Sequence, residues 1–309
     1  MSKRNPNKIK EGSSIATFLV HVLLIVLALI CIYPIWYTFI ISLSSPIVAR
    51  TLDVFLLPDT IYLGSYEQTL ADPLVWSGYA NTILYAGSCC VGMLITCAMT
   101  AYPLTSPLLV GKKIMVWFIL IPMYFGGGLI PTFLWMNKLG LYDTRWSIIL
   151  PGMVSMWYII LVRTFFASIP EELRESARID GANNYQILFN VYVPTSKPIM
   201  AVIAIYTIVA QWNSYFAAMI YLPTESKQPL QLYLRRLLIL MQNAAEAANS
   251  ESGGGGTTAS DAEAAMQMAL SADQLKYTII VVSTLPMLII YPFLQKYFVK
   301  GVMVGSLKG

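Results

Sequence analysis

The chain has few charged residues for its length. Of its 309 residues only 12% are Asp, Glu, Lys or Arg, whereas 57% are hydrophobic. Soluble domains carry about one-quarter charged residues. This composition, with a mean hydropathy of +0.63, therefore excludes an ordinary soluble domain and predicts an integral membrane protein.

The motifs of several catalytic and binding classes are also absent. No Gly-x-x-x-x-Gly-Lys-[Ser/Thr] phosphate loop occurs, so the chain cannot hydrolyse ATP alone. A single histidine, His21, leaves no nucleophile–histidine–carboxylate set and no HExxH helix. Basic residues do not cluster with aromatic ones, which argues against nucleic acid as a partner. The cysteines lie in apolar segments without metal or disulfide spacing: Cys31, Cys89, Cys90 and Cys97. We expect no enzyme, no metal and no cofactor held by this chain.

Much of the chain consists of long apolar segments. Six are long enough to cross a hydrocarbon core of about 30 Å, at about 15–43, 79–102, 114–136, 146–162, 198–222 and 275–299. Pro122 and the glycines at 126–128 interrupt the third, so a break is expected there. None of the six contains Asp or Glu, which disfavours an ion-coupled carrier. The predicted fold is all-α, with residues 1–309 as one membrane domain.

Lysine and arginine set the expected orientation. The first span follows four basic residues, as a signal peptide does, but its apolar run is too long and no small-x-small cleavage site follows, so we expect an uncleaved helix. A cytoplasmic N-terminus places 13 of the 20 Lys and Arg inside. The positive-inside rule therefore favours a multi-pass cell-membrane protein with both termini in the cytoplasm.

The longest charged, helix-patterned segment lies between the fourth and fifth spans. Ser168 is expected to cap a helix, with Glu171 at the capping-box position. Gly181 should end that helix, because glycine readily takes the left-handed conformation at a helix C-terminus. Asn183 or Asn184 can then cap a second helix, which Pro194 ends or bends.

A spaced pattern runs through the same segment. Glu175, Ser176 and Ala177 are followed after three residues by Gly181, and after nine more by Val191, one residue and Val193-Pro194. This resembles the EAA loop of the membrane subunits of binding-protein-dependent ABC importers. Its pattern is Glu-Ala-Ala, three residues, Gly, nine residues, Ile, one residue, Leu-Pro. The departures at Ser176, Val191 and Val193 are small or similar in volume.

The resemblance implies a type I importer permease with six membrane helices and a cytoplasmic coupling loop at 168–197. In that family the loop seats in a groove of the ATPase subunit. Carried over, Glu175 is the polar contact, Ser176 and Ala177 allow close approach, Gly181 flanked by Asp180 is the turn, and Pro194 sets the angle into the fifth span.

The likeness extends beyond the loop to carbohydrate-uptake permeases, nearest to those for aldouronate and other complex oligosaccharides. It is carried by residues 128–132, 211–213 and 295–309. It implies a C-terminal tail at the ATPase interface, with Gly305, Ser306, Lys308 and Gly309. It also implies the partners: a second homologous permease, two cytoplasmic ATPases that bind ATP, an extracellular or periplasmic sugar-binding protein, an oligosaccharide and the lipid bilayer.

Two features of the sequence, one expected outside the membrane and one in the fifth span, admit alternative interpretations. Residues 223–273 form an expected extracellular insertion: an amphipathic surface helix at 230–241, then Ala-rich pieces around four consecutive glycines. It could contact the binding protein or be a tolerated insertion. In the fifth span, amide and aromatic groups suit sugar hydroxyls and ring faces, or serve helix packing instead. They are Gln211, Trp212, Asn213 and Tyr215.

Two rival functions remain at this point. A permease for a polyol or glycerol phosphate would keep the mechanism and change the substrate. A membrane scaffold or channel without an ATPase partner is a different class, against which the EAA spacing argues.

Overall fold

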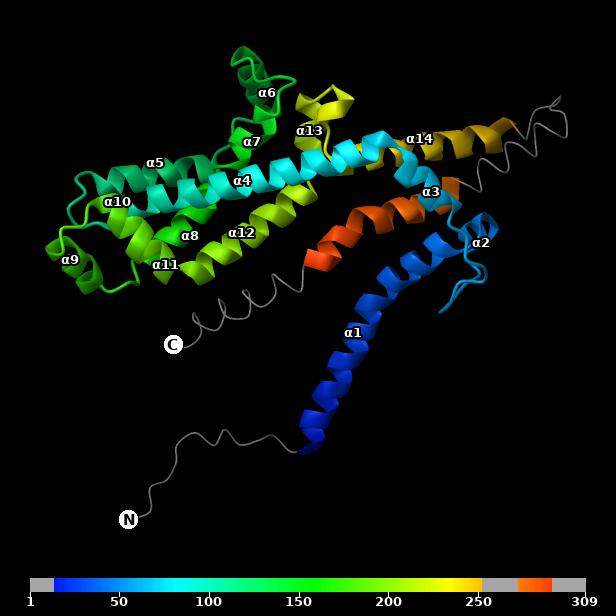
Figure 1. The fold of residues 1–309 in the computed structure, drawn as a ribbon, viewed down its shortest axis with the longest axis horizontal. Coiled ribbons are helices and arrows are strands. Elements are labelled where there is room, and N and C mark those ends of the chain that lie inside the picture. The colour runs from blue at the N-terminus through cyan, green and yellow to red at the C-terminus, as the bar shows by residue number, and fades with distance from the viewer. Residues whose placement is uncertain (1–13, 252–271, 291–309) are drawn as a thin grey trace. The chain divides into compact units, whose positions relative to one another are not determined.

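The computed structural model describes residues 14–251 and 272–290, and no strand occurs within these ranges (Figure 1). The all-α prediction is confirmed. The α-helices in chain order are α1 (Ser14–Leu43), α2 (Pro46–Thr51), α3 (Gly64–Ala71), α4 (Pro73–Thr105), α5 (Lys112–Tyr124), α6 (Leu129–Lys138), α7 (Trp146–Gly152), α8 (Met156–Phe166), α9 (Glu171–Ile179), α10 (Asn184–Ile187), α11 (Val193–Thr195), α12 (Lys197–Trp212), α13 (Phe216–Tyr221) and α14 (Leu230–Glu251). A π-helical turn spans Leu188–Tyr192, a 3₁₀ turn spans Glu225–Lys227, and a last helix spans Ala272–Ile290.

Four of these helices are long and apolar enough to cross a membrane: Thr17–Leu43, Pro73–Thr105, Trp146–Phe166 and Ala272–Ile290. Two bent pairs raise the number to six if each pair is one span. One is α5 with α6, bent by 113° at the glycines where a break was predicted; the other joins residues 184–195 to α12 at 81°. Six spans therefore remain a prediction within the part of the chain that is described.

The chain divides into two compact units, Met1–Thr69 with Met241–Val282, and Leu70–Leu240 with Ser283–Gly309. In the first, the fully buried Gln274 links three segments. Its amide nitrogen donates to the Ser44 carbonyl at 2.7 Å, and its amide oxygen accepts from the Ser65 hydroxyl at 2.8 Å. Both ends of the side chain are thus satisfied, as burial of an amide requires.

The second unit is built around α4, alongside which α5, α8 and α12 run (Figure 1). Small residues such as Cys97, Ala98 and Ala101 are almost fully buried on α4 and let the neighbouring helices approach closely. The cluster that they join has fifteen buried members: Met93, Cys97, Ala98, Ala101, Tyr102, Leu104, Ile119, Ile159, Val162, Phe166, Ile169, Ile187, Leu188, Tyr192 and Ile203. This cluster connects the apolar helices directly to the charged segment that follows α8.

Side chains of α4 also satisfy the break between α7 and α8. The Thr96 hydroxyl donates to the Met153 carbonyl at 2.5 Å, directly after α7, and the Cys89 thiol lies 3.8 Å from the Ile149 carbonyl within α7. Irregular backbone at membrane depth needs such partners because lipid offers none.

The predicted fifth span, 198–222, is divided into two helices. Helix α12 ends at Trp212, and α13 begins only at Phe216. At the break, the Asn213 side-chain amide donates to the Val209 carbonyl at 3.0 Å. Asparagine competes in this way for helix carbonyls, so it favours a helix end over a helix interior.

Candidate coupling segment and transport path

Helix α9 opens the charged segment. Glu171 and Glu172 stand in its first turn, where carboxylates complement the positive end of the helix dipole. The capping prediction for Ser168 is wrong: Pro170 holds the N-cap position without a side-chain cap, and the Ser168 hydroxyl donates to the Phe165 carbonyl at 2.7 Å. Proline starts the helix because the N–H that it lacks would have no partner in the first turn.

One charged side chain of α9 faces inward. Arg174 is only 1% exposed and forms an ion pair with Glu171, one turn earlier. A buried charge is costly unless paired, and Glu171 supplies the partner from the same helix. The burial of Arg174 shows which face of α9 is turned toward the core.

The turn after α9 is a complete Schellman motif. Gly181 has φ +81°, and its N–H donates to the Arg178 carbonyl at 3.0 Å. The Ala182 N–H reaches back to the Ala177 carbonyl at 2.9 Å. These bonds satisfy two carbonyls that the end of a helix leaves free. The prediction that Gly181 ends the helix through a left-handed residue is confirmed.

The second helix of the segment begins with a capping box. The Asn183 side chain accepts from the Gln186 N–H at 2.9 Å, and the Gln186 side chain accepts from the Asn183 N–H at 2.8 Å. Of the two asparagines predicted as caps, Asn183 is the one used. Two capped helices with a defined turn between them make the segment rigid.

Between α10 and α12 the backbone forms a wider, π-helical turn and then bends. A π turn spans Leu188–Tyr192, followed by the short α11, which contains Pro194. Proline removes one backbone bond and its ring crowds the carbonyl four residues earlier, a conflict that a wider turn accommodates. The 81° bend comes directly after, so Pro194 lies next to the bend that was predicted from it.

The predicted docking residues separate by exposure. Glu175, Ser176, Asp180 and Pro194 are exposed, whereas Ala177 is half-buried and packs against the core cluster. Sequence reasoning missed Ile179, whose side chain is 86% exposed at the end of α9. Single exposed hydrophobic residues are common on protein surfaces, so the available signal was its place among the predicted docking residues, one residue before Asp180.

The four residues predicted to line the path do not gather on one surface. Trp212 is 4% exposed and its indole N–H donates to the Ser283 carbonyl at 3.2 Å, so it packs helices together. Gln211 is half-buried, and Asn213 is exposed but spends its amide on its own helix. Tyr215 is half-buried beneath Arg235, whose guanidinium carbon is 4.3 Å from the ring centroid.

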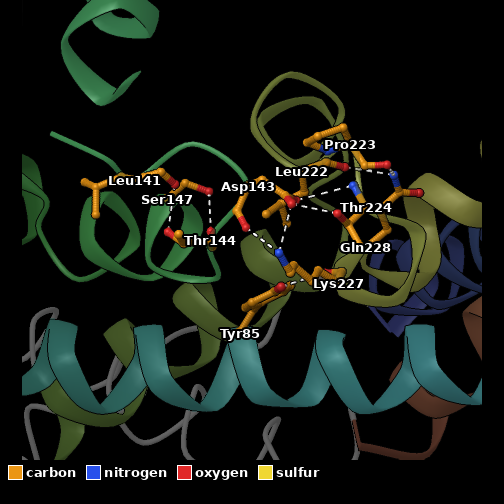
Figure 2. Close-up of polar contacts among 10 residues, drawn as sticks. All are labelled: Tyr85, Leu141, Asp143, Thr144, Ser147, Leu222, Pro223, Thr224, Lys227 and Gln228. Carbon is orange, nitrogen blue, oxygen red and sulfur yellow. Dashed lines mark hydrogen bonds and ion pairs between the residues drawn. The ribbon is translucent and has the colours of Figure 1, made fainter. Parts of the chain in front are cut away.

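Beside the N-terminal half of α4, polar contacts tie two loops together (Figure 2). The Asp143 carboxylate accepts from the Thr224 hydroxyl at 2.6 Å, from the Thr224 N–H at 3.3 Å and from the Lys227 ammonium at 2.9 Å. Lys227 also donates to the Asp143 carbonyl at 2.6 Å. The hydrogen bond from Thr224, then the contact with Lys227, lower the pKa of Asp143 below its usual value.

The network around Asp143 includes α4 itself. The Tyr85 hydroxyl donates to the Lys227 carbonyl at 2.6 Å, and the Gln228 amide donates to the Leu222 carbonyl at 2.8 Å (Figure 2). Asp143 has φ +54°, a conformation that Asp and Asn tolerate better than most residues. Sequence analysis did not single out this network, because its members are far apart in the chain.

Two sets of predicted residues lie outside the described part of the chain. They are the C-terminal residues Gly305, Ser306, Lys308 and Gly309, and the glycine-containing part of the insertion at 252–271. The predicted surface helix 230–241 is the start of the longer α14, and its first turns are buried through Leu230, Leu232 and Leu234 rather than lying freely on a surface.

Comparison with known proteins decides the family. The profile described as "Binding-protein-dependent transport system inner membrane component" matches residues 95–304, which is more than half of the chain. The chain belongs to this family. The importer-permease resemblance is thereby confirmed, and the protein is a multi-pass membrane component of a transport system.

Individual relatives agree with the family. The permease is 31% identical over 291 residues to the polygalacturonan/rhamnogalacturonan transport system permease protein YtcP of Bacillus subtilis, covering 94% of this chain and 97% of the other. It is 36% identical over 258 residues to Protein LplC of the same organism, covering 82% of each chain. A crystal structure of a bacterial ABC transporter involved in the import of the acidic polysaccharide alginate superposes with a TM-score of 0.80 at 38% identity, covering 92% of this permease and 97% of that chain.

Proposed function

We propose that this permease forms half of the translocation path of an ATP-driven, binding-protein-dependent importer of oligosaccharides. A second, homologous permease would form the other half, and two ATPase subunits would bind and hydrolyse ATP. An extracellular or periplasmic binding protein would deliver the sugar. The relatives named for polygalacturonan, rhamnogalacturonan and alginate support a saccharide cargo.

The observation that carries the proposal is the geometry of residues 171–195. Two capped helices meet at a fixed left-handed turn and present Glu175, Ile179 and Asp180, while Ala177 and Arg174 anchor the segment to the helical core. A rigid element bonded to the core transmits a rigid-body motion, as helix shifts at subunit interfaces do. In the proposed orientation, this segment and both termini face the cytoplasm and Asp143 faces outward.

The function is tested with the assembled complex. The permease is expressed with the permease, ATPase and binding protein encoded beside it, reconstituted in lipid, and assayed for ATP hydrolysis with loaded and empty binding protein over an oligosaccharide panel. Stimulation by one class of oligosaccharide is the expected result. Stimulation only by a polyol or a glycerol phosphate would contradict the cargo, and failure to assemble with an ATPase would contradict the mechanism.

The docking role is tested by charge reversal. Glu175→Lys should reduce co-purification of the ATPase, because it replaces a negative charge with a positive one at the proposed contact. Glu67→Lys, at an exposed glutamate of α3, is the matched control and should not change it. Equal ATPase recovery in the wild type and in Glu175→Lys would remove Glu175 from the interface.

A further inference from the structure

A cavity of about 420 Å³ lies between the C-terminal end of α4 and the coupling segment, residues 171–195. Apolar and polar side chains share its lining: Met99, Leu108 and Leu188 are apolar, and Arg178, Asn184 and Tyr185 are polar. No acidic side chain of the described residues belongs to the lining. The volume falls within the range of small-ligand sites, about 300–1,000 Å³, and the lining suits a ligand that is both amphiphilic and anionic.

The cavity lies at the end of a membrane span. Helix α4 is apolar enough to cross a membrane over Pro73–Thr105, and the lining residues Met99 and Tyr102 stand in its last two turns. Apolar side chains remain exposed in the following loop and at the start of α5, where Leu108 is 69% exposed and Ile114 is 75% exposed. Exposed apolar surface of this kind marks contact with a membrane or a partner. A ligand in the cavity would therefore have its polar part at the membrane boundary and its apolar part beside these side chains.

Arg178 supplies the positive charge of the lining. It is exposed and forms no ion pair with any carboxylate of residues 14–251 or 272–290. A guanidinium in this state can bind a phosphate through two parallel hydrogen bonds. A second cation lies close by, because the Lys112 ammonium donates to the Thr105 carbonyl at 3.3 Å, next to the lining residue Ser106. Basic pockets between membrane helices on the cytoplasmic side bind anionic lipid headgroups.

The cavity also joins two structural elements. The Tyr102 hydroxyl of α4 lies 3.5 Å from the side-chain oxygen of Asn184 in the coupling segment, and both residues line the cavity. The Tyr102 ring packs edge-on against Tyr192, with the ring centroids 5.0 Å apart. A molecule in the cavity would contact the span and the coupling segment at once. Its binding would favour the arrangement in which the two lie together, because a ligand stabilises the state that it binds more tightly.

We propose that this cavity binds the phosphate headgroup of an anionic phospholipid, with Arg178 as the phosphate contact, and that the bound lipid stabilises the coupling segment for its work with the ATPase. The Lys112 ammonium adds a second favourable charge. Asn184 and Tyr185 offer polar groups to the hydroxyls of a glycerol headgroup. The effect on ATP hydrolysis rests on the proposed function, whereas the binding of the lipid does not.

The experiment places the complete complex of permeases and ATPases in nanodiscs of phosphatidylcholine with a rising fraction of phosphatidylglycerol. Native mass spectrometry counts the phosphatidylglycerol molecules that stay bound, and ATP hydrolysis is measured on the same samples with loaded binding protein. Arg178→Gln and Arg178→Lys change the phosphate contact. Met99→Trp fills the cavity from α4 and leaves the coupling segment unchanged. Arg50→Gln, at an exposed arginine of α2, is the matched control.

In the wild type, ATP hydrolysis should rise with the fraction of phosphatidylglycerol. Arg178→Gln should lower the apparent affinity for this lipid about tenfold, the effect of losing a charged, bidentate contact. Arg178→Lys should lose less, because lysine keeps the charge but lacks the planar fork. Met99→Trp should also reduce the bound lipid, and Arg50→Gln should bind it as the wild type does. Inorganic phosphate added to discs of phosphatidylcholine alone should not raise hydrolysis, because it has no acyl chains to contact Leu108 and Ile114.

Three results would overturn the assignment. The first is wild-type retention of phosphatidylglycerol in both Arg178→Gln and Met99→Trp. The second is equal stimulation by inorganic phosphate, which would make the cavity a site for a soluble anion. The third is a loss of hydrolysis in Arg178→Gln that is equal with and without phosphatidylglycerol while lipid retention is unchanged, which would make Arg178 a contact of the ATPase. The mass spectrum reports lipid binding and assembly with the ATPase as separate quantities, so failure of the proposed function is distinguishable from failure of the lipid site.

Discussion

The left-handed turn at Gly181 allows the coupling segment to be perturbed by one methyl group. Gly181 has φ +81°, and a Cβ built on it meets no atom within 4 Å. Substitution by alanine therefore creates no clash, and its whole cost is the conformational one of placing an L-residue in the left-handed region, about 1–2 kcal/mol. Asparagine tolerates that region better, so Gly181→Asn should cost less.

The magnitude gives a measurable effect on coupling. At 25 °C, about 1–2 kcal/mol reduces the population of the native turn roughly 5- to 30-fold relative to competing conformations. If the ATPase recognises the native turn, its apparent affinity for the permease should fall by up to that factor in Gly181→Ala and by less in Gly181→Asn. ATPase binding to the detergent-solubilised permeases, titrated by fluorescence, measures both.

A second left-handed glycine provides the control. Gly140 has φ +69° and a Cβ there also meets nothing within 4 Å, but it lies in the loop after α6. Gly140→Ala carries the same intrinsic strain without touching the coupling segment, so its ATPase affinity should be that of the wild type. Equal losses in Gly140→Ala and Gly181→Ala, or no loss in either, would refute the role given to the Gly181 turn.

Three further changes test the packing and the network around Asp143. Gly152→Ala should lower the free energy of unfolding by about 1–3 kcal/mol, because the new Cβ would overlap the Cys89 sulfur, and thermal unfolding in detergent measures this. Trp212→Phe removes the indole N–H that donates to the Ser283 carbonyl and should cost about 1 kcal/mol in the same assay without abolishing assembly. The lowered pKa of Asp143 means that its contact with Lys227 stabilises the fold fully above the ordinary carboxyl pKa and is lost as the pH falls through the lowered value. In Asp143→Asn the melting temperature should therefore fall less than in the wild type as the pH is lowered into the acid range. An equal fall in both proteins would contradict the assignment.

The coupling segment shows what local sequence can predict. Gly181 and Asn183 act through their own backbone and through neighbours within five residues, so turn and cap chemistry predicted them from the residue types alone. The prediction that Ser168 caps α9 was wrong for an equally local reason. Two signals competed, a serine with a glutamate three residues on and a proline in the first turn, and the proline holds the N-cap position.

Composition located the apolar stretches of the membrane part, but it did not predict where their helices end. The break after Trp212 depends on how one asparagine side chain competes for a carbonyl. The wide separation of Gln274 from its partner Ser65, 209 residues along the chain, shows the other limit. Contacts of that kind follow from tertiary packing, and no residue spacing in the sequence indicates them.

The network around Asp143 and the contact of Arg235 with Tyr215 also depend on tertiary packing. A short apolar stretch with two central arginines predicted a surface helix, but the burial of Leu232 and the stacking of Arg235 arise from contacts with distant helices. The sequence thus identified residue types suited to sugar contact. The structure distinguishes Trp212, which packs between helices, from Tyr215, which contacts the guanidinium of Arg235.

ATP-dependent uptake of a labelled oligosaccharide into proteoliposomes is the measurement that tests the central claim most directly. The complete complex with its binding protein should accumulate the sugar only with ATP, and a complex with Gly181→Pro should lose uptake because proline cannot adopt a positive φ. Uptake by the permeases alone, without ATPase subunits or ATP, would contradict the account and favour a channel.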